Sequence, residues 1–243
     1  MSLFVIADLH LSTLDSTNKS MEVFGPKWAN YTQRLEVAWK SIVTEKDTVI
    51  VPGDISWALT LEEAESDLRF LDQLPGKKIL LKGNHDFWWT TMSKLQRFLD
   101  EKNLHTLLFL HNNAYVINDY VICGSRGWYH DSDIDGAKQA NASYEKIVLR
   151  ECVRLSLSLK EAVKLIEQSE TSLTPVCFLH FPPHWSEKTC QPILDVLKEY
   201  DVKYCYFGHI HGAEPTSFEK DDIHFTLVAA DALGFTPKLI SQQ

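Results

Sequence analysis

The sequence predicts a mixed α/β fold that contains more than one sheet, or a mixed sheet, and the favoured arrangement is two packed mixed sheets with helices on the outside. Three observations lead to this prediction. Between residues 3 and 99, short apolar runs alternate with amphipathic helical patterns. Between residues 106 and 123, apolar runs follow one another with only short polar gaps. After residue 176 the strand-helix alternation resumes. A single parallel sheet would explain the strand-helix units but not the hairpins between residues 106 and 123.

The first half of the chain predicts three strand-helix units. Apolar strands are expected at 3–7, 48–51 and 78–81, and amphipathic helices at 31–42, 61–71 and 92–99. Thr60 and Glu63 form a capping box at the start of the second helix, and Pro75-Gly76 ends it.

The second half predicts hairpins first and strand-helix units later. The runs 106–110, 114–117 and 120–123 are separated by polar gaps of the kind that connect hairpins. Residues 138–168 are rich in helix formers and predict one long helix or a broken pair. Strands are expected at 176–179, 204–207 and 225–229, with a helix at 193–200. Because no repeat or flexible linker is present, we expect one domain over 1–243 with a helical insertion around 138–170.

The charge balance limits the classes of partner. The chain has 243 residues, 44% of them apolar, as in ordinary globular proteins. Its net charge of -9, from 33 acidic and 24 basic residues, argues against the broad basic surface of non-specific nucleic-acid binding. An anionic substrate remains compatible, because bound divalent cations would make a site locally positive.

The cysteines and the apolar runs predict a cytoplasmic location. Five cysteines form no C-x-x-C pair, so we expect buried free thiols in a reducing compartment. The N-terminus lacks the pattern of a signal peptide, and no apolar run approaches the ~20 residues of a membrane helix.

Metal-capable side chains stand at the ends of five strand-like runs. They are Asp8 with His10, Asp54, Asn84 with His85, His180, and His209 with His211. Because loops at the carboxyl ends of strands gather around a ligand crevice, these residues are expected to converge. Each one alone is equally well explained as a turn, a cap or a structural histidine. Their conjunction favours a metal site, and ligands of the Asp, Asn and His types without thiolates favour Mn, Fe or Zn over structural zinc.

The ordered set of motifs resembles the calcineurin-like metallophosphoesterase superfamily over nearly the whole chain. The motifs are Asp8-x-His10, Gly53-Asp54, Gly83-Asn84-His85-Asp86, His180 and Gly208-His209-x-His211. The resemblance implies a four-layer αββα sandwich that holds two divalent cations. It assigns Asp8, His10, Asp54 and His211 to one cation, and Asp54, Asn84, His180 and His209 to the other. It leaves His85 as a general acid that binds no metal.

The implied activity is hydrolysis of a phosphodiester or a phosphomonoester by a metal-bridging hydroxide, with His85 protonating the leaving alcohol. Two positions depart from the family pattern. Trp57 stands where many members carry an acid that orients the catalytic histidine, which argues against a protein-phosphatase-like role. Asp86 stands where several members have Glu.

The substrate-binding residues are less well defined by the sequence. The loop after residue 123 offers Arg126, Trp128, Tyr129 and His130 for phosphate binding and base stacking, although a packed loop explains them as well. We expect a small phosphoester substrate, nucleotides included, and neither a membrane nor a nucleic-acid partner. The alternative is a non-catalytic metal-binding interaction scaffold of the same fold, against which the retained His85 argues.

Overall fold

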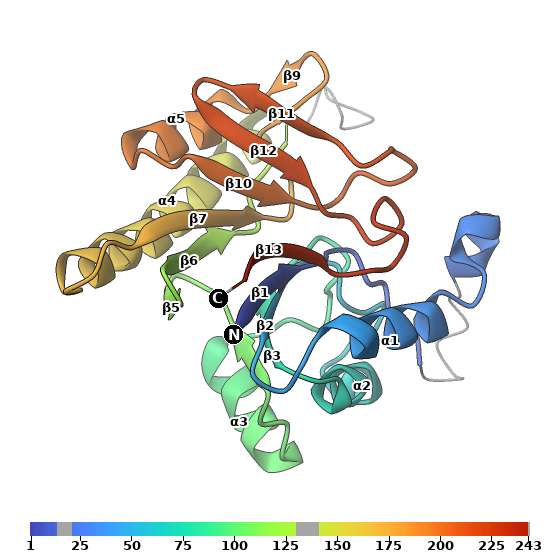
Figure 1. Cartoon of the computed structure of the whole chain (residues 1–243). Coiled ribbons are helices and arrows are strands. Elements are labelled where there is room, and N and C mark those ends of the chain that lie inside the picture. Colours follow the sequence, from blue (N-terminus) through green and yellow to red (C-terminus); the bar gives the residue numbers. More distant parts are fainter. Residues whose placement is uncertain (14–20, 130–140, 243) are drawn as a thin grey trace. The chain divides into compact units, whose positions relative to one another are not determined.

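The computed structural model describes residues 1–13, 21–129 and 141–242 (Figure 1). The chain forms two compact units. The first comprises Met1–Phe109, Gly208–Thr216 and Leu227–Gln243, and the second comprises Leu110–Phe207 and Ser217–Thr226. Each unit has one large mixed sheet and its own α-helices. The predicted α/β class with two mixed sheets and accompanying helices is therefore confirmed.

The first unit is built from the predicted strand-helix units. Its sheet has the order β13-β1-β2-β3-β4, in which β1 to β4 are parallel and β13 is antiparallel to β1. The strands are β1 (Ser2–Val5), β2 (Thr48–Pro52), β3 (Lys77–Leu81), β4 (Leu107–Phe109) and β13 (Lys238–Gln242). The helices are η2 (Met21–Phe24), η3 (Pro26–Trp28), α1 (Tyr31–Ile42), α2 (Glu65–Gln73) and α3 (Met92–Lys102).

The helices of the first unit are held by apolar stripes that face its core. Helix α1 buries Tyr31, Leu35 and Trp39, which follow one another at four-residue steps. The Trp39 indole is fully buried, and its Nε1 donates to the carbonyl oxygen of Pro75 at 3.0 Å. The periodicity that predicts this helix is thus the periodicity of its core contacts.

Lys78 in β3 joins the end of α2 to the sheet. It is fully buried, and its ammonium group donates to the carbonyl oxygens of Leu74 at 2.6 Å, Gly76 at 2.7 Å and Asp72 at 3.3 Å. A cation at a helix C-terminus satisfies carbonyl groups that lack partners within the helix. Burial lowers the pKa of Lys78 to about 8, against the opposing charge of Asp72.

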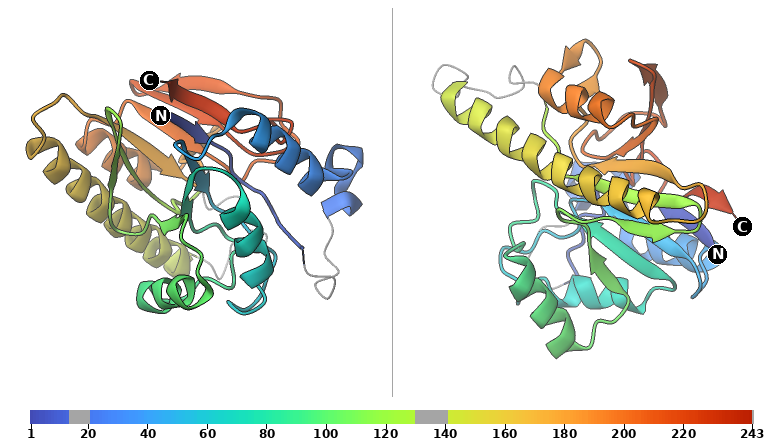
Figure 2. Two further views of the ribbon diagram at one scale, coloured as in Figure 1. Left: turned by 60° about the horizontal axis from the view of Figure 1, so that its bottom comes forward. Right: turned by 90° about the vertical axis from the view of Figure 1, so that its left-hand side faces the viewer.

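The second unit combines hairpins with parallel strands. Its sheet has the order β11-β12-β10-β7-β6-β5, in which β6, β7 and β10 are parallel. The strands are β5 (Tyr115–Ile117), β6 (Tyr120–Ser125), β7 (Thr174–Leu179), β10 (Tyr204–Phe207), β11 (Ser217–Lys220) and β12 (Ile223–Leu227). The hairpin of β8 (His184–Trp185) and β9 (Lys188–Thr189) precedes α5 (Gln191–Glu199). Residues 141–167 form one continuous helix, α4 (Asn141–Glu167), and not a broken pair (Figure 2).

One predicted hairpin is wrong. The runs 106–110 and 114–117 do not pair, because β4 pairs in parallel with β3 in the first unit, whereas β5 pairs with β6 in the second. Helix α3 returns the chain to the sheet that it left, so β4 completes a strand-helix-strand crossover. The pattern of apolar runs also missed β11 and β13, whose sequences mix polar and apolar residues.

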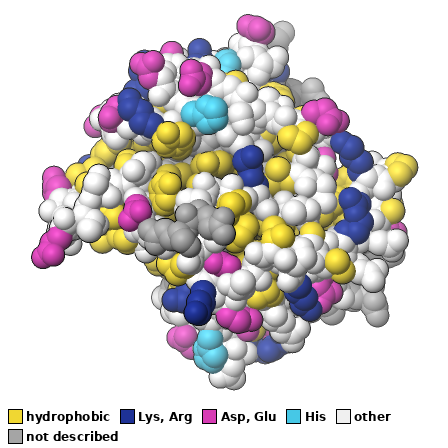
Figure 3. All heavy atoms as spheres, viewed as in Figure 1, with side chains coloured by type: hydrophobic (Ala, Val, Ile, Leu, Met, Phe, Trp, Pro, Cys, Tyr) yellow, Lys and Arg dark blue, Asp and Glu magenta, His cyan; other side chains and the backbone are white. Residues whose placement is uncertain are grey.

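The cysteines are free thiols, most of them buried, and the surface carries charged side chains of both signs. All five cysteines are free, and four of them, Cys123, Cys177, Cys190 and Cys205, are buried. Hydrogen bonding to Cys177 and burial raise the pKa of the Cys123 thiol well above its usual range, which keeps it protonated and unreactive. Within the described residues, every helix is too short or too polar to cross a bilayer. Acidic and basic side chains are interspersed on the face shown in Figure 3.

Candidate metal centre

Loops at one edge of the first unit's sheet carry most of the predicted metal ligands. Asp8 and His10 follow β1, Asp54 follows β2, and Asn84 and His85 follow β3. The loops are joined by backbone hydrogen bonds from Asp8 N to Gly53 O at 3.0 Å and from His10 N to Asp54 O at 2.9 Å. Because parallel strands end at the same edge, the order of the chain brings these residues together.

Asp8, His10 and His211 form a compact cluster of donors, all within 4.8 Å of one another. The Nε2 atoms of His10 and His211 lie 3.1 Å apart, and Nε2 of His10 lies 3.7 Å from Oδ2 of Asp54. Adjacent nitrogen ligands of a cation bound at ~2.1 Å are separated by about 3 Å. The donor types and their spacing therefore suit a divalent cation.

The carboxylates at this edge are buried. Asp8 and Asp54 are 0% and 1% exposed. Burial raises the pKa of Asp8 well above its usual range and that of Asp54 to about 6, although the backbone N–H of His209 opposes the first shift and that of His85 opposes the second. Two carboxylates in such a place are costly as anions without a neutralising cation. A bound cation would offset this cost, so two buried carboxylates are expected at a metal site.

The backbone at four predicted ligands adopts a left-handed conformation. Asp8, His10, Asp54 and His209 have φ values of 58°, 44°, 51° and 72°. Residues other than glycine rarely occupy this region, and such strain concentrates at functional sites. The left-handed backbone therefore points these side chains in directions that an extended backbone would not allow.

Two glycines allow the backbone to approach the carboxylates. A Cβ atom on Gly83 would lie 2.1 Å from Oδ1 of Asp54. A Cβ atom on Gly208 would lie 2.7 Å from Oδ2 of Asp8. The N–H groups of His85 and His209 then donate to Asp54 and Asp8, at 2.8 Å for His85 and at 2.9 Å for the shorter His209 bond. The glycines in the two motifs are therefore required by close packing.

Asp86 joins the loop after β2 to the loop after β3. Its Oδ1 accepts from Ile55 N at 2.9 Å, Ser56 N at 3.2 Å and Trp88 Nε1 at 3.0 Å, and its Oδ2 accepts from Gly83 N at 2.8 Å. Burial raises the pKa of Asp86 to about 7, with a further contribution from the charge of Asp54. The sequence left this residue without a role, because two of its four donors, Ile55 N and Ser56 N, come from the loop after β2.

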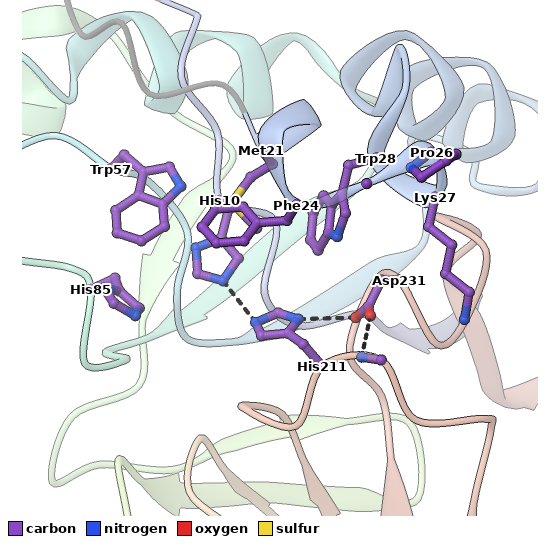
Figure 4. Close-up of a pocket in the computed structure, with 12 residues that line it drawn as sticks. His10, Met21, Phe24, Pro26, Lys27, Trp28, Trp57, His85, His211 and Asp231 are labelled. Carbon is purple, nitrogen blue, oxygen red and sulfur yellow. Dashed lines mark hydrogen bonds and ion pairs between the residues drawn. The ribbon is translucent and has the colours of Figure 1, made fainter. Parts of the chain in front are cut away.

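Asp231 was missed by the sequence reasoning. Its Oδ1 lies 3.0 Å from Nδ1 of His211, and its Oδ2 accepts from Gly212 N at 2.7 Å (Figure 4). Burial disfavours the His211 imidazolium, but the hydrogen bond and charge of Asp231 outweigh it and raise the pKa of His211. A carboxylate behind a histidine fixes which nitrogen faces a metal. The available signal was the position of Asp231 after the apolar run 225–230, which parallels Asp8 after 3–7.

His85 lies at the accessible side of the centre. Its side chain is 35% exposed, and its Nε2 lies 4.0 Å from Oδ2 of Asp54. The Trp57 ring contacts it with centroids 4.3 Å apart and stacks on His10 at 4.9 Å. Packing against the Trp57 indole therefore limits the orientation of the His85 ring.

The remaining predicted residues belong to the second unit. His180 is buried at the end of β7, and its N–H donates to the carbonyl oxygen of Arg126 at 3.1 Å. The Arg126 guanidinium lies 3.1 Å from Glu151 and 4.6 Å above the Trp128 ring, while Trp128 stacks on Tyr129 at 5.3 Å. These contacts match the packed loop that was the alternative. His130 lies outside the described residues.

Comparisons with known proteins agree with this geometry. Residues 1–213 match the family described as calcineurin-like phosphoesterase. The fold is similar to that of a phosphopantetheinyl hydrolase from Mycobacterium tuberculosis, with a TM-score of 0.53, 14% identity, and coverage of 100% of this chain and 96% of the other.

Two further solved structures share the fold. One is TT1561 of Thermus thermophilus, with a TM-score of 0.60, 8% identity and coverage of 98% of this chain and 96% of the other. The second is GAP50, the anchor in the inner membrane complex of Plasmodium, with a TM-score of 0.54, 11% identity and coverage of 96% and 72%. A comparison with curated proteins finds no match. The family match, which spans most of the sequence, shows that the chain belongs to the calcineurin-like phosphoesterases.

Proposed function

We propose that the protein hydrolyses small phosphoesters with the help of two divalent cations, Mn, Fe or Zn. The observation that carries the proposal is the cluster of the buried Asp8 and His10 with the more exposed His211, which lies beside Asp54 and a partly exposed His85. When bound, the cations supply an acidified water and neutralise the charge that develops on the phosphoryl oxygens.

The proposed ligand sets are those that the family motifs imply. Asp8, His10, Asp54 and His211 would hold one cation, and Asp54, Asn84, His180 and His209 the other. We further propose 1–243 as one domain. Asp231 orients His211, while Asp86 and Gly83 keep Asp54 and the His85 loop in contact. Arg126, Trp128, Tyr129 and His130 remain proposed substrate residues of lower rank, because Glu151 already engages Arg126.

His85 is the proposed general acid. Its imidazole is partly exposed, and its Nε2 lies 4.0 Å from Oδ2 of Asp54. His85 would donate a proton to the leaving oxygen as the bond to phosphorus breaks. Trp57 holds the ring in place from one side.

A paired substitution experiment tests the assignment. Asp54→Ala is expected to lose both metal and activity, whereas His85→Ala is expected to keep its metal and to lose about 100-fold to 10,000-fold in kcat. Metal content is measured by elemental analysis, and activity is measured on p-nitrophenyl phosphate and bis(p-nitrophenyl) phosphate. Full turnover by fully metallated His85→Ala protein would remove His85 from the mechanism.

The second candidate is a metal-binding interaction scaffold. The similarity to GAP50, which is described as an anchor, supports such a role for this fold. The accessible imidazole of His85 and the pocket next to it support the enzyme instead. Metallated protein that is inert toward a broad panel of phosphoesters would favour the scaffold.

A further inference from the structure

A pocket of about 600 Å³ opens directly beside His10, His85 and His211 in the first unit. Its wall is largely apolar and is formed by Met21, Phe24, Pro26, Trp28 and Trp57 (Figure 4). A volume of this size suits a small organic ligand. The pocket therefore continues the proposed catalytic centre into an apolar chamber.

The aromatic wall is continuous with the histidines. The Trp57 ring lies 4.3 Å from that of His85 and 4.9 Å from that of His10. The Trp28 ring lies 5.7 Å from that of His211 and 6.1 Å from that of His10. Trp57 and Trp28 thus stand on either side of His10 (Figure 4). Any group attached to a phosphate at these histidines meets indole faces first.

One side of the pocket is tightly packed, and on the other side the described residues leave an apolar ring exposed. Trp28 is 4% exposed and packs edge-on against Tyr31 at 5.3 Å and Phe235 at 5.1 Å. Phe24 lines the same pocket but is 68% exposed. Lys27 at the rim lies 3.8 Å from Glu214, and both side chains are largely exposed. An exposed ring that faces a packed aromatic wall is the arrangement that a ring of the ligand would cover.

The geometry points to a phosphoester whose leaving alcohol carries an aromatic ring, and we infer that this ring occupies the pocket. The inference rests on the proposed function, because the leaving group must lie on the side of His85, the residue that protonates it. That side is walled by Trp57. An alcohol as small as ethanol would leave most of this apolar wall uncovered, so an alcohol that carries a ring is favoured.

The test compares phenethyl phosphate with ethyl phosphate, whose leaving alcohols differ little in basicity but greatly in apolar surface. Metal-loaded wild-type protein is expected to prefer the phenethyl ester by roughly 10-fold to 100-fold in kcat/KM, mainly through KM. Phe24→Ala is expected to reduce this preference several-fold. Val23→Ala is the matched control, because Val23 is 81% exposed in the same helix and does not line the pocket.

A binding measurement separates the inference from the proposed function. Calorimetry on the metal-loaded protein compares phenethylphosphonate with ethylphosphonate, neither of which is hydrolysed. Preferential binding of the phenethyl compound supports the pocket assignment even if no ester is turned over, an outcome that would refute the hydrolase proposal alone. Equal binding of the two phosphonates, together with equal hydrolysis of the two esters, would overturn the pocket assignment and leave the hydrolase proposal intact.

Discussion

Replacement of Asp86 by asparagine perturbs the junction between the loops that carry Asp54 and His85. The carboxylate accepts four hydrogen bonds, three at Oδ1 and one at Oδ2, and all of the donors are N–H groups. An amide keeps one acceptor oxygen but turns an N–H group toward another donor. With the oxygen facing Ile55 and Ser56, the amide nitrogen would face the N–H of Gly83.

The expected cost follows from that hydrogen-bond count. Above the Asp86 pKa of about 7, where the acceptor is an ionised group, losing the bond from Gly83 costs about 1.5–3 kcal/mol. The hydrogen bonds that remain at residue 86 become weaker, because their acceptor is no longer charged. Removing a buried carboxylate also removes its desolvation cost, which offsets part of this loss of stability. We expect Asp86→Asn to lower the free energy of unfolding by about 2–4 kcal/mol and to weaken metal binding by about 10-fold to 100-fold, as loss of an outer partner does.

Asp47→Asn is the matched control. Asp47 is a buried aspartate in the same unit, and it accepts from Ser2 N and Thr44 N. It precedes β2 and therefore lies at the opposite edge of the sheet from Asp54. Its substitution should destabilise the protein without changing metal affinity. Urea unfolding measures the first quantity and calorimetric metal titration the second; wild-type metal affinity in Asp86→Asn would refute the positioning role.

Three further substitutions test other contacts. The pKa of Lys78 is about 8 in the folded state and 10.5 ordinarily, so the unfolded chain binds more protons than the folded chain between these pH values. The free energy of unfolding should therefore rise by about 3 kcal/mol as the pH increases through this window. Lys78→Met should remove this rise, as measured by urea unfolding at several pH values. Asp231→Asn should weaken metal binding about 10-fold to 100-fold in a calorimetric titration, because His211 loses its orienting carboxylate, and unchanged affinity would contradict this. Gly208→Ala should displace Asp8 and reduce the metal content found by elemental analysis. Gly234→Ala strains the backbone at a φ of 59° but adds a carbon that meets nothing within 4 Å, so it should retain the metal.

Local patterns in the chain were sufficient to predict the strand-helix units and the convergence of most predicted ligands. The four-residue steps of Tyr31, Leu35 and Trp39 are the inward face of α1. Asp8, Asp54 and His85 meet because each follows a strand, and parallel strands end at one edge. Both inferences need only short-range backbone geometry and one rule of topology.

Tertiary packing decided the features that depend on partners remote in the sequence. The pairing of β4 with β3, the carboxylate of Asp231 behind His211 and the contacts of Asp86 with the backbone of Ile55 and Ser56 have no local signature. The same holds for the aromatic wall: the sequence singles out Trp57 only as the replacement of an acid and gives Trp28 no role, whereas packing places the two rings on either side of His10. The reason is physical. A periodic pattern determines which face of an element is buried, but only the assembled core determines which side chain from elsewhere in the chain fills the space against that face.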